Sequence, residues 1–200
     1  QRYQQTLGAL DRITPLLQHA NIANLPDARS FKQSKGDIEL KNVSLTLADT
    51  PILQDVSLHI QAGSTVAIVG PTGSGKTTLI NLLARVFDVT SGQILIDGQD
   101  IREVDLDDLR RSIASVPQST FLFSQALHHN VRMGNQDVTD TSLDEAVHIS
   151  RVSNDLAQLP NGLETLVGEK GVMLSCGQKQ RVAIARAILR DSPILVLDDA

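Results

Sequence analysis

The sequence contains one cysteine, Cys176, no tryptophan and one tyrosine, and aromatic residues make up only 2% of its 200 residues. A single cysteine cannot form a disulfide within the chain, so a reducing compartment fits this composition. The scarcity of aromatic side chains disfavours the stacking surfaces that bind single-stranded nucleic acid. The formal net charge of -5 also gives no electrostatic reason to expect nucleic acid as a partner.

The sequence also lacks a long hydrophobic run. No apolar stretch approaches the roughly 18 residues that a membrane-spanning helix needs, and the polar residues 1–10 lack the core of a signal peptide. Hydrophobic residues nevertheless make up 41% and charged residues 20% of the chain, which is enough to build a core. The chain starts without Met and stops shortly after an apolar segment, so we expect a fragment of a longer polypeptide.

Residues 70–78 read GPTGSGKTT and fit the Gly-x-x-x-x-Gly-Lys-Ser/Thr pattern of a phosphate-binding loop. The apolar run 65–69 predicts a strand before the loop, and residues 76–86 have helical spacing after it. Glycines let successive backbone N–H groups turn towards a phosphate, and the helix N-terminus adds partial positive charge. Lys76 would reach the β- and γ-phosphates, and the Thr77 hydroxyl would ligate Mg2+. The alternative is a glycine-rich turn with a chance lysine, which the flanking patterns disfavour. The expected nucleotide-binding residues are Gly70, Pro71, Thr72, Gly73, Ser74, Gly75, Lys76, Thr77 and Thr78.

The N-terminal segments read as a helix followed by a linker. Residues 1–24 place leucines and isoleucines at helical spacing, although Pro15 would kink or end such a helix. This pattern fits an amphipathic surface helix or the end of a helix that arrives from an upstream domain. Residues 25–36 mix Pro, Gly, Ser and charge without periodicity, which is typical of a linker.

From residue 37 the hydrophobic residues alternate and predict two strands up to residue 60, joined by a turn at 48–51, with an irregularity near Asn42. Farther along, the pattern predicts strands at 93–98 and 113–116, a short helix at 106–111, and mainly helices from 119 to 161. Ser142 would start a capping box, and Ser153 would cap a shorter turn. A long helix at 177–190 and a buried strand at 194–197 complete the predicted elements.

Two segments near the C-terminal end have candidate ligands. Asp198 follows the apolar strand 194–197, and a buried parallel strand would deliver its carboxylate to the sheet edge where α/β proteins bind ligands. Asp198 could therefore hold Mg2+ through water, whereas the alternative for such an acid is a helix cap or a turn. The segment 174–178 opens the long helix, and its Ser175 and Gly177 could form either an anion site or an ordinary cap.

With these segments in one order, the chain resembles the nucleotide-binding domain of an ATP-binding-cassette (ABC) transporter, of the exporter type fused to a transmembrane domain. The resemblance runs from about Ile38 to Ala200. It rests on the phosphate loop, Gln118 in Val-Pro-Gln, the segment 165–171, the signature 174–178 with the following Lys-Gln-Arg, and the Asp198 strand. The segments 121–123, 130–134 and 165–171 are similar to multidrug and lipid exporters rather than importers.

The resemblance implies an α/β fold of the P-loop NTPase class, with a mostly parallel core sheet, an N-terminal antiparallel β lobe and a helical lobe at about 119–174. It divides the chain into the end of a transmembrane-domain helix (1–24), a linker (25–36) and an incomplete nucleotide-binding domain (37–200). The C-terminal part of the domain, with a histidine that the family needs, would lie beyond Ala200. We therefore expect the isolated fragment to bind nucleotide weakly and hydrolyse little.

The resemblance also implies partners and roles. Two such domains would meet head to tail on two ATP molecules, each held by the loop of one chain and the signature of the other. The signature residues are Leu174, Ser175, Cys176, Gly177 and Gln178. The implied magnesium ligands are Thr77, Gln118 and Asp198. The implied catalytic residues are Asp199, Gln118 and Lys76. Gln118 and Glu169 would also contact the transmembrane domain, so that ATP hydrolysis drives export at the cytoplasmic face of the inner membrane.

Three residues depart from the family pattern. Asp199 stands where the family has Glu, and a shift of about 1 Å can cost roughly a hundredfold in rate. This favours a heterodimer in which the chain's own site is weakened, although a slower homodimer is the simpler reading. Leu47 lies near the place of an aromatic that stacks on adenine. Cys176 replaces a signature glycine, and its side chain either crowds the partner's ATP or points away.

Two other functions fit the same motifs. One is a regulatory module that binds ATP and dimerises but hydrolyses little, which the short side chain of Asp199 suggests. The other is a soluble ABC ATPase of DNA repair or translation, which the exporter-type segment 165–171 disfavours.

Overall fold

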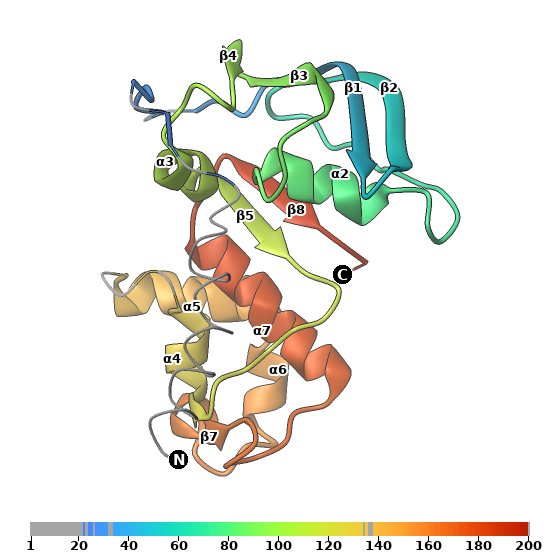
Figure 1. Cartoon of the computed structure of the whole chain (residues 1–200). Helices are drawn as coiled ribbons and strands as arrows, with labels where there is room; N and C mark the ends of the chain where they lie inside the picture. The colour runs from blue at the N-terminus through green and yellow to red at the C-terminus, as the bar shows by residue number, and fades with distance from the viewer. Residues whose placement is uncertain are drawn as a thin grey trace, which may run out of the picture. The chain divides into compact units, whose positions relative to one another are not determined.

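A computed structural model describes residues 22, 24–25, 27–31, 34–133, 135 and 138–199. The chain forms two compact units, the first from residues 1–33 and 37–109 and the second from residues 34–36 and 110–200 (Figure 1). The helix predicted over residues 1–24 lies outside the described residues, apart from positions 22 and 24. Among the described residues, no helix combines the length and the apolar character of a membrane span.

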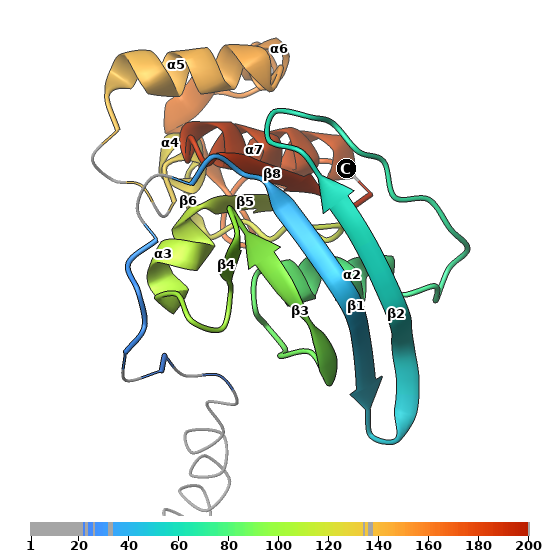
Figure 2. The same cartoon turned by 90° about the horizontal axis from the view of Figure 1, so that it is seen from above.

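The first unit contains a four-stranded antiparallel sheet in the order β2-β1-β3-β4. Its strands are β1 (Ile38–Leu47), β2 (Thr50–Ile60), β3 (Ser91–Ile96) and β4 (Gln99–Asp100), and Figure 2 shows β1 between β2 and β3. Ile38, Leu40, Val43 and Leu45 are buried, which is the face that the alternation predicts. The expected antiparallel β lobe is therefore confirmed. The hairpin turn has fewer residues than the predicted 48–51, because β2 already starts at Thr50.

The irregularity predicted near Asn42 is also confirmed. The pairing of β1 with β2 shifts between Leu40 and Val43, and Asn42 has a φ of 48°. Across the strand pair, Asp55 has a φ of 50° and accepts a hydrogen bond of 2.7 Å from the Asn42 side-chain amide. Asn and Asp tolerate the left-handed region better than most residues, so this pair of facing irregularities bends both strands at one point.

The prediction of a strand at 65–69 is wrong, because the structure forms no strand there. The sheet of the first unit joins only β1 to β4, so this segment has no pairing partner within its unit. Val69 is 89% exposed, and Val66 and Ile68 are exposed as well. The following helix, α2 (Lys76–Leu83), is present but ends before the predicted residue 86, since Arg85 has a φ of 50°.

Part of the predicted linker is bonded to the first unit. The N–H of Arg29 donates to the carbonyl of Glu103 at 2.8 Å. Phe31 is buried, and its N–H donates to the Asp108 carboxylate at 3.0 Å. The predicted short helix is confirmed as α3 (Leu106–Arg111), which contains Asp108. Hydrogen bonding thus orders a stretch whose composition alone is typical of a linker.

The second unit contains a parallel pair of strands, β5 (Ile113–Val116) and β8 (Ile194–Leu197), so both predicted strands are present with the predicted bounds. Ala114 and Val116 of β5 pack against Ala183 and Ala187 of the long helix α7 (Cys176–Leu189). The expectation of a wholly buried β8 is wrong, since Leu195 and Leu197 are 53% and 54% exposed. Within this unit β8 pairs with β5 alone, so parts of its side chains stay uncovered.

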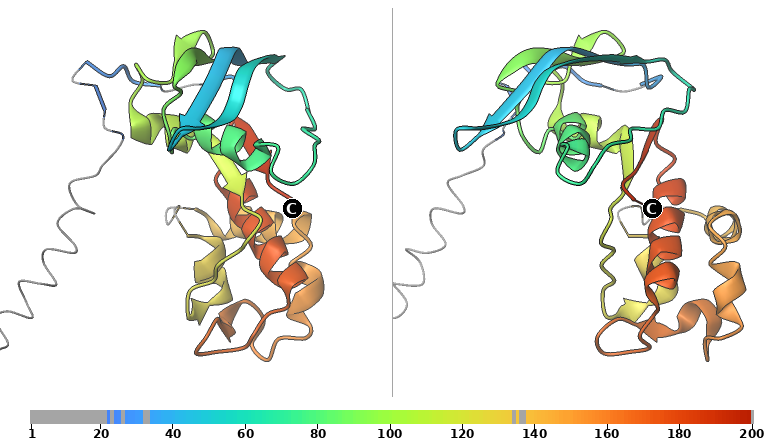
Figure 3. Two further views of the ribbon diagram at one scale, coloured as in Figure 1. Left: turned by 45° about the vertical axis from the view of Figure 1, so that its right-hand side comes forward. Right: turned by 90° about the vertical axis from the view of Figure 1, so that its right-hand side faces the viewer.

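The helix-rich region predicted from residue 119 starts later, at 127, after an extended stretch. Its elements are β6 (Gln125–Ala126), α4 (Leu127–Val131), α5 (Asp140–Ile149), α6 (Ser153–Leu156), the short 3-10 helix η1 (Gly162–Glu164) and β7 (Leu166–Val167). Figures 1 and 3 show α4 and α5 beside α7. One apolar cluster joins them, and it includes Leu127, Val131, Val147, Val182 and Leu189.

The predicted N-cap residues of two helices, Ser142 and Ser153, are wrong. Helix α5 starts at Asp140 and Thr139 is its N-cap, because the Thr139 hydroxyl accepts the N–H of Ser142. Ser142 therefore lies inside the helix rather than at its start. Likewise Ser153 is the first residue of α6, and Val152 before it caps the helix without a side-chain bond.

Candidate functional site

The glycine loop of the first unit turns through left-handed backbone at Gly73 (φ 83°) and Gly75 (φ 88°). A β-carbon at Gly75 would lie 2.8 Å from Leu53 Cδ2 and 3.3 Å from the Ile52 carbonyl oxygen, whereas one at Gly73 would meet nothing within 4 Å. Gly75 is thus required by both conformation and space, and Gly73 by conformation alone. The loop runs from there directly into α2, with Gly75 as the N-cap.

The side chain of Lys76 folds back over this loop. Its Nζ donates to the carbonyl oxygens of Gly70 at 2.9 Å and Pro71 at 3.0 Å. The ammonium group therefore lies against the carbonyls that begin the loop, and Lys76 is the first residue of the helix, whose N-terminus has unsatisfied N–H groups. Pro71, Thr72, Gly73, Ser74 and Thr77 are exposed, and Thr78 is half-buried. A solvent-open loop with an ammonium, backbone amides and a helix N-terminus fits a polyphosphate.

The second unit brings together Gln118 and Asp199. The Gln118 side-chain amide donates to Asp199 Oδ2 at 3.1 Å. The preceding acid, Asp198, extends the strand ladder, because its N–H donates to the carbonyl of Val116 at 3.0 Å. Both acids thus follow β8, as the sequence predicts. Asp199 has a φ of 51°, which is unusual for a residue other than glycine.

A second amide also holds Asp199, and the sequence did not predict it. The Gln180 side chain on α7 donates to the backbone carbonyl of Asp199 at 3.2 Å. Gln180 follows the signature segment by two residues, but no local pattern marks its side chain as a partner of the acid.

The signature segment opens α7 as a capping box. Ser175 is the N-cap, its hydroxyl accepts the N–H of Gln178 at 3.3 Å, and the Gln178 side chain accepts the N–H of Ser175 at 2.9 Å. Leu174 is buried and anchors the start of the helix, whereas the Cys176 thiol is exposed. A β-carbon at Gly177 would meet only Arg181 Nη1, at an ordinary 3.6 Å. The packing of this chain therefore does not require glycine at position 177.

Buried Asn130 and half-buried Arg186 form a polar cluster in the second unit that the sequence did not predict. Asn130 is 0% exposed. Its side chain accepts the N–H of Phe123 at 2.9 Å and donates to the Phe123 carbonyl at 3.0 Å. Arg186 donates to the Asn130 backbone carbonyl at 2.5 Å and to the Phe121 carbonyl at 3.0 Å. Burial lowers the pKa of Arg186 below its ordinary value.

This cluster fixes the segment that presents two exposed aromatic rings. Phe121 and Phe123 are exposed and pack edge to face with ring centroids 5.0 Å apart. A Tyr, Phe or Trp on the surface is a common anchor for a partner protein. In the sequence, no local pattern marks Asn130 as the centre of this cluster.

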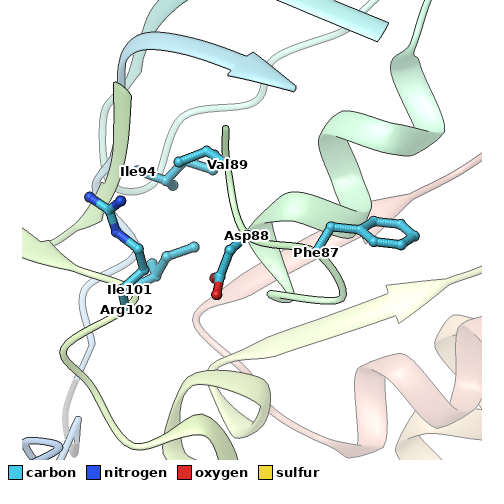
Figure 4. Close-up of a pocket in the computed structure, with 6 residues that line it drawn as sticks. All are labelled: Phe87, Asp88, Val89, Ile94, Ile101 and Arg102. Carbon is cyan, nitrogen blue, oxygen red and sulfur yellow. The ribbon is translucent and has the colours of Figure 1, made fainter. Parts of the chain in front are cut away.

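A small hollow in the first unit lies apart from these residues. It is lined by Phe87, Asp88, Val89, Ile94, Ile101 and Arg102, and Figure 4 shows the Phe87 ring pointing away from the other five side chains. None of the predicted site residues line it. Beside it the 4% exposed Arg85 binds Asp88, and Arg102 binds Asp100. Burial raises the pKa of Asp100, but hydrogen bonds from Arg102 and its charge outweigh burial and hold that pKa below its ordinary value.

Comparison with known proteins gives one consistent family. A family model described as ABC transporter matches residues 53–200. The ATP-dependent lipid A-core flippase of Syntrophus aciditrophicus is 41% identical over 198 residues, which cover 98% of this chain and 33% of the flippase. The mitochondrial iron-sulfur clusters transporter ATM1 of Gibberella zeae is 46% identical over 184 residues, which cover 91% of this chain and 26% of the transporter.

A solved structure of a bacterial Atm1-family ABC exporter with ATP bound superimposes with a TM-score of 0.90 at 37% identity, over 98% of this chain and 34% of that chain. The mixed α/β fold expected from the sequence is therefore confirmed. The chain spans about a third or less of the length of these relatives.

Proposed function

Because this chain belongs to the ABC transporter family and carries the nucleotide-binding domain of its exporter-type members, we propose that it binds and hydrolyses ATP with Mg2+ to power export across a membrane. The observation that carries the proposal is the Lys76 ammonium, which lies over the glycine loop within 2.9 Å of the Gly70 carbonyl oxygen. Lysine side chains usually lie in solvent or form an ion pair, but among the described residues the Lys76 ammonium donates to loop carbonyls alone, at a helix N-terminus. Phosphate oxygens are stronger acceptors for an ammonium than these carbonyls.

In the first unit, the residues 70–78 would hold the triphosphate. The loop N–H groups and Lys76 would bind its oxygens, and the Thr77 hydroxyl would be a magnesium ligand. The bound nucleotide and metal supply the phosphoryl group and the charge that activates it for transfer. The protein's part is mainly positioning and charge neutralisation, which suits a loop whose glycines fix its shape. Leu47, at the exposed end of β1, would pack against the adenine.

In the second unit, Asp199 would orient and polarise the attacking water, and Asp198 would hold Mg2+. The Gln118 amide, 3.1 Å from the Asp199 carboxylate, supports this division of roles, since it orients the acid and has a carbonyl oxygen for the metal or the water. Asp199 is one methylene shorter than glutamate, so we propose that turnover at this chain's own site is slow.

The signature would serve a nucleotide held by a second nucleotide-binding domain. Two features support this. The Ser175 hydroxyl acts as an acceptor in the cap, and a hydroxyl can donate its hydrogen at the same time. A β-carbon at Gly177 would meet only the flexible end of Arg181, at 3.6 Å, so the packing of its own chain does not require glycine there, whereas close approach of an outside group would. We propose a head-to-tail pair, preferably with a different chain whose site compensates for Asp199.

The membrane partner would be a transmembrane domain of the same polypeptide, with the nucleotide-binding domain at the cytoplasmic face of the inner membrane. The relatives support a membrane setting by their names, which include a flippase and a putative multidrug export ATP-binding/permease protein of Bacillus subtilis that is 41% identical over 199 residues. The exposed pair Phe121 and Phe123 and the exposed Glu169 are the surface that we assign to it.

A regulatory module that binds ATP with little hydrolysis is the second candidate, and Asp199 is the observation that favours it. Both functions need nucleotide binding, so binding is the first test. We expect Lys76→Ala to weaken Mg-ATP binding by the purified chain roughly ten- to a hundredfold, because a hydrogen bond to a charged group is worth about 1.5–3 kcal/mol. Equilibrium dialysis with labelled ATP measures it.

The matched control is Lys41→Ala. Lys41 forms an exposed ion pair with Glu39 in the same unit, and such surface pairs contribute little. Equal ATP affinity of the wild type and Lys76→Ala would contradict a phosphate-binding role of the loop.

A further inference from the structure

Asp199 is held at both its backbone and its side chain by glutamine amides. Gln118 donates to its carboxylate at 3.1 Å, and Gln180 donates to its backbone carbonyl at 3.2 Å. We infer that Gln180 is a positioning residue, which fixes the backbone of Asp199 so that the carboxylate stays on Gln118. The inference rests on the proposed catalytic role of Asp199, and it adds a residue that acts through that acid.

The backbone of Asp199 needs such support. Its φ of 51° lies in the left-handed region, where a β-carbon crowds the neighbouring carbonyl oxygen. Non-glycine residues persist there only when the surrounding structure over-determines them, and such residues cluster at functional sites. Asp199 follows the last residues of β8, so the strand ladder fixes only the residue before it, through the N–H of Asp198. The Gln180 amide supplies a further contact, at the backbone carbonyl of Asp199 itself.

Gln180 lies on a helix that is itself firmly anchored in the second unit. Next to it, Arg181 makes two hydrogen bonds to the Asp155 carboxylate, at 2.8 and 2.7 Å, and these bonds raise the pKa of Arg181 above its ordinary value. Farther along, Val182 and Ala185 are buried in the apolar cluster. The backbone at position 180 is therefore held by well-packed neighbours on α7.

The same helix starts with the signature. Gln180 follows the N-cap Ser175 by five residues, which is roughly 7.5 Å along a helix. Under the proposed function, Ser175 contacts the nucleotide of the partner domain, whereas Asp199 serves the nucleotide of its own chain. The Gln180 amide thus links α7, whose N-terminus would contact the partner's nucleotide, to Asp199, which would act on the nucleotide of its own chain.

The test uses three substitutions in the whole chain. Gln180→Glu keeps the size of the side chain but removes its N–H donors, whereas Gln180→Lys keeps a donor. Gln158→Glu is the control, because Gln158 is an exposed residue of the same unit without a side-chain bond among the described residues. Unfolding temperatures of all three variants show whether the fold is intact.

The first readout is amide hydrogen exchange of the peptide that covers residues 194–199, measured without nucleotide. We expect exchange there to be severalfold faster in Gln180→Glu than in the wild type, close to the wild type in Gln180→Lys, and unchanged in Gln158→Glu. Exchange in Gln180→Glu equal to that of the wild type would overturn the inference, whether or not the chain binds ATP.

The second readout is ATP turnover by the transporter that contains the chain. We expect Gln180→Glu to lower kcat roughly ten- to a hundredfold with KM unchanged. We expect Gln180→Lys to lower kcat less, because it keeps a donor. A drop of the same size in both variants, or no drop in Gln180→Glu, would overturn the positioning role. If the wild type itself neither binds nor hydrolyses ATP, the proposed function fails, and the exchange result still decides whether Gln180 holds Asp199.

Discussion

Gly92 and Asn42 lie so close together that a β-carbon on Gly92 would stand 2.3 Å from the carbonyl oxygen of Asn42. Gly92 also has a φ of 81°. The close approach and the left-handed backbone of Gly92 both occur where β1 bends at its irregularity near Asn42 and β3 begins beside it. The bend in β1 is therefore possible only because Gly92, the second residue of the neighbouring strand β3, has no side chain.

We predict that Gly92→Ala lowers the free energy of unfolding by about 2–4 kcal/mol, because the β-carbon meets backbone and the left-handed conformation is strained as well. Urea unfolding followed by circular dichroism measures it. Gly98→Ala is the matched control, since Gly98 has a φ of 76° but open space around it, and should cost only about 1 kcal/mol. Equal losses in the two variants would show that the contact with Asn42 relaxes freely.

Asp100 gives a pH dependence with a definite sign. Its pKa in the folded protein lies below the ordinary value, which is about 3.9 in an unfolded chain. The stabilisation is therefore complete above that pH and disappears as the pH falls through the folded value. We predict that Asp100→Asn is less stable than the wild type by about 1–2 kcal/mol at pH 7, and that the difference shrinks below about pH 4.

Urea unfolding at a series of pH values measures this difference. Asp107→Asn serves as the control, because Asp107 is exposed and makes no side-chain bond within the described part of the chain. A gap between the wild type and Asp100→Asn that stays constant from pH 7 to pH 2 would rule out the ion pair with Arg102 as its cause.

Local chemistry made the phosphate loop and the β lobe predictable. Gly73 and Gly75 are required by their own backbone angles, Ser175 and Gln178 cap each other three residues apart, and alternation alone gives the buried face of β1. Such features depend on neighbours in the sequence. The cap at Thr139 shows the limit of this approach, since Thr139 and Ser142 are both good caps and only the start of α5 decides between them.

Contacts between distant residues were not predictable. The run 65–69 has strand composition but no pairing partner within its unit. The amide of Gln180 reaches an acid 19 positions away, and Arg186 reaches Asn130 across 56 positions. No periodicity or turn signal encodes such pairs, so the positioning of Asp199 and the support of the Phe121–Phe123 segment became visible only in the structure.

The Asn130 cluster predicts a large loss of stability for a small change. Asn130→Ala removes the groups that satisfy both the N–H and the carbonyl of Phe123 in a fully buried place. We predict a loss of about 2–4 kcal/mol in the free energy of unfolding, since buried polar groups left without partners are costly. Asn154→Ala, at an exposed position of α6, should change it by less than about 0.5 kcal/mol. Comparable values for the two variants would mean that water replaces the amide.

Asp199 separates the two proposed functions. Glutamate is longer by one methylene, and placement of a catalytic group to within about 1 Å can decide roughly a hundredfold in rate. We predict that Asp199→Glu raises ATP turnover of the transporter at least about tenfold, with little change in ATP affinity, because the loop that holds the phosphates is untouched. Steady-state phosphate release measures turnover, and equilibrium dialysis measures affinity.

Asp144→Glu, on the exposed face of α5, is the control for the added methylene, and Asp199→Asn should abolish the remaining activity of this site. Turnover in Asp199→Glu equal to that of the wild type would mean that aspartate already places the water well. The proposal that this chain's own site is weakened would then be wrong.

The Gln118 amide gives a further test of the Asp199→Glu variant. It donates to the Asp199 carboxylate at 3.1 Å, so a longer acid must either shift or break that hydrogen bond. Because Gln118 is itself proposed to reach the metal or the water, the double variant Asp199→Glu, Gln118→Ala is compared with Gln118→Ala alone. A gain from Asp199→Glu that is present only when Gln118 is present would assign the improvement to a carboxylate still oriented by Gln118.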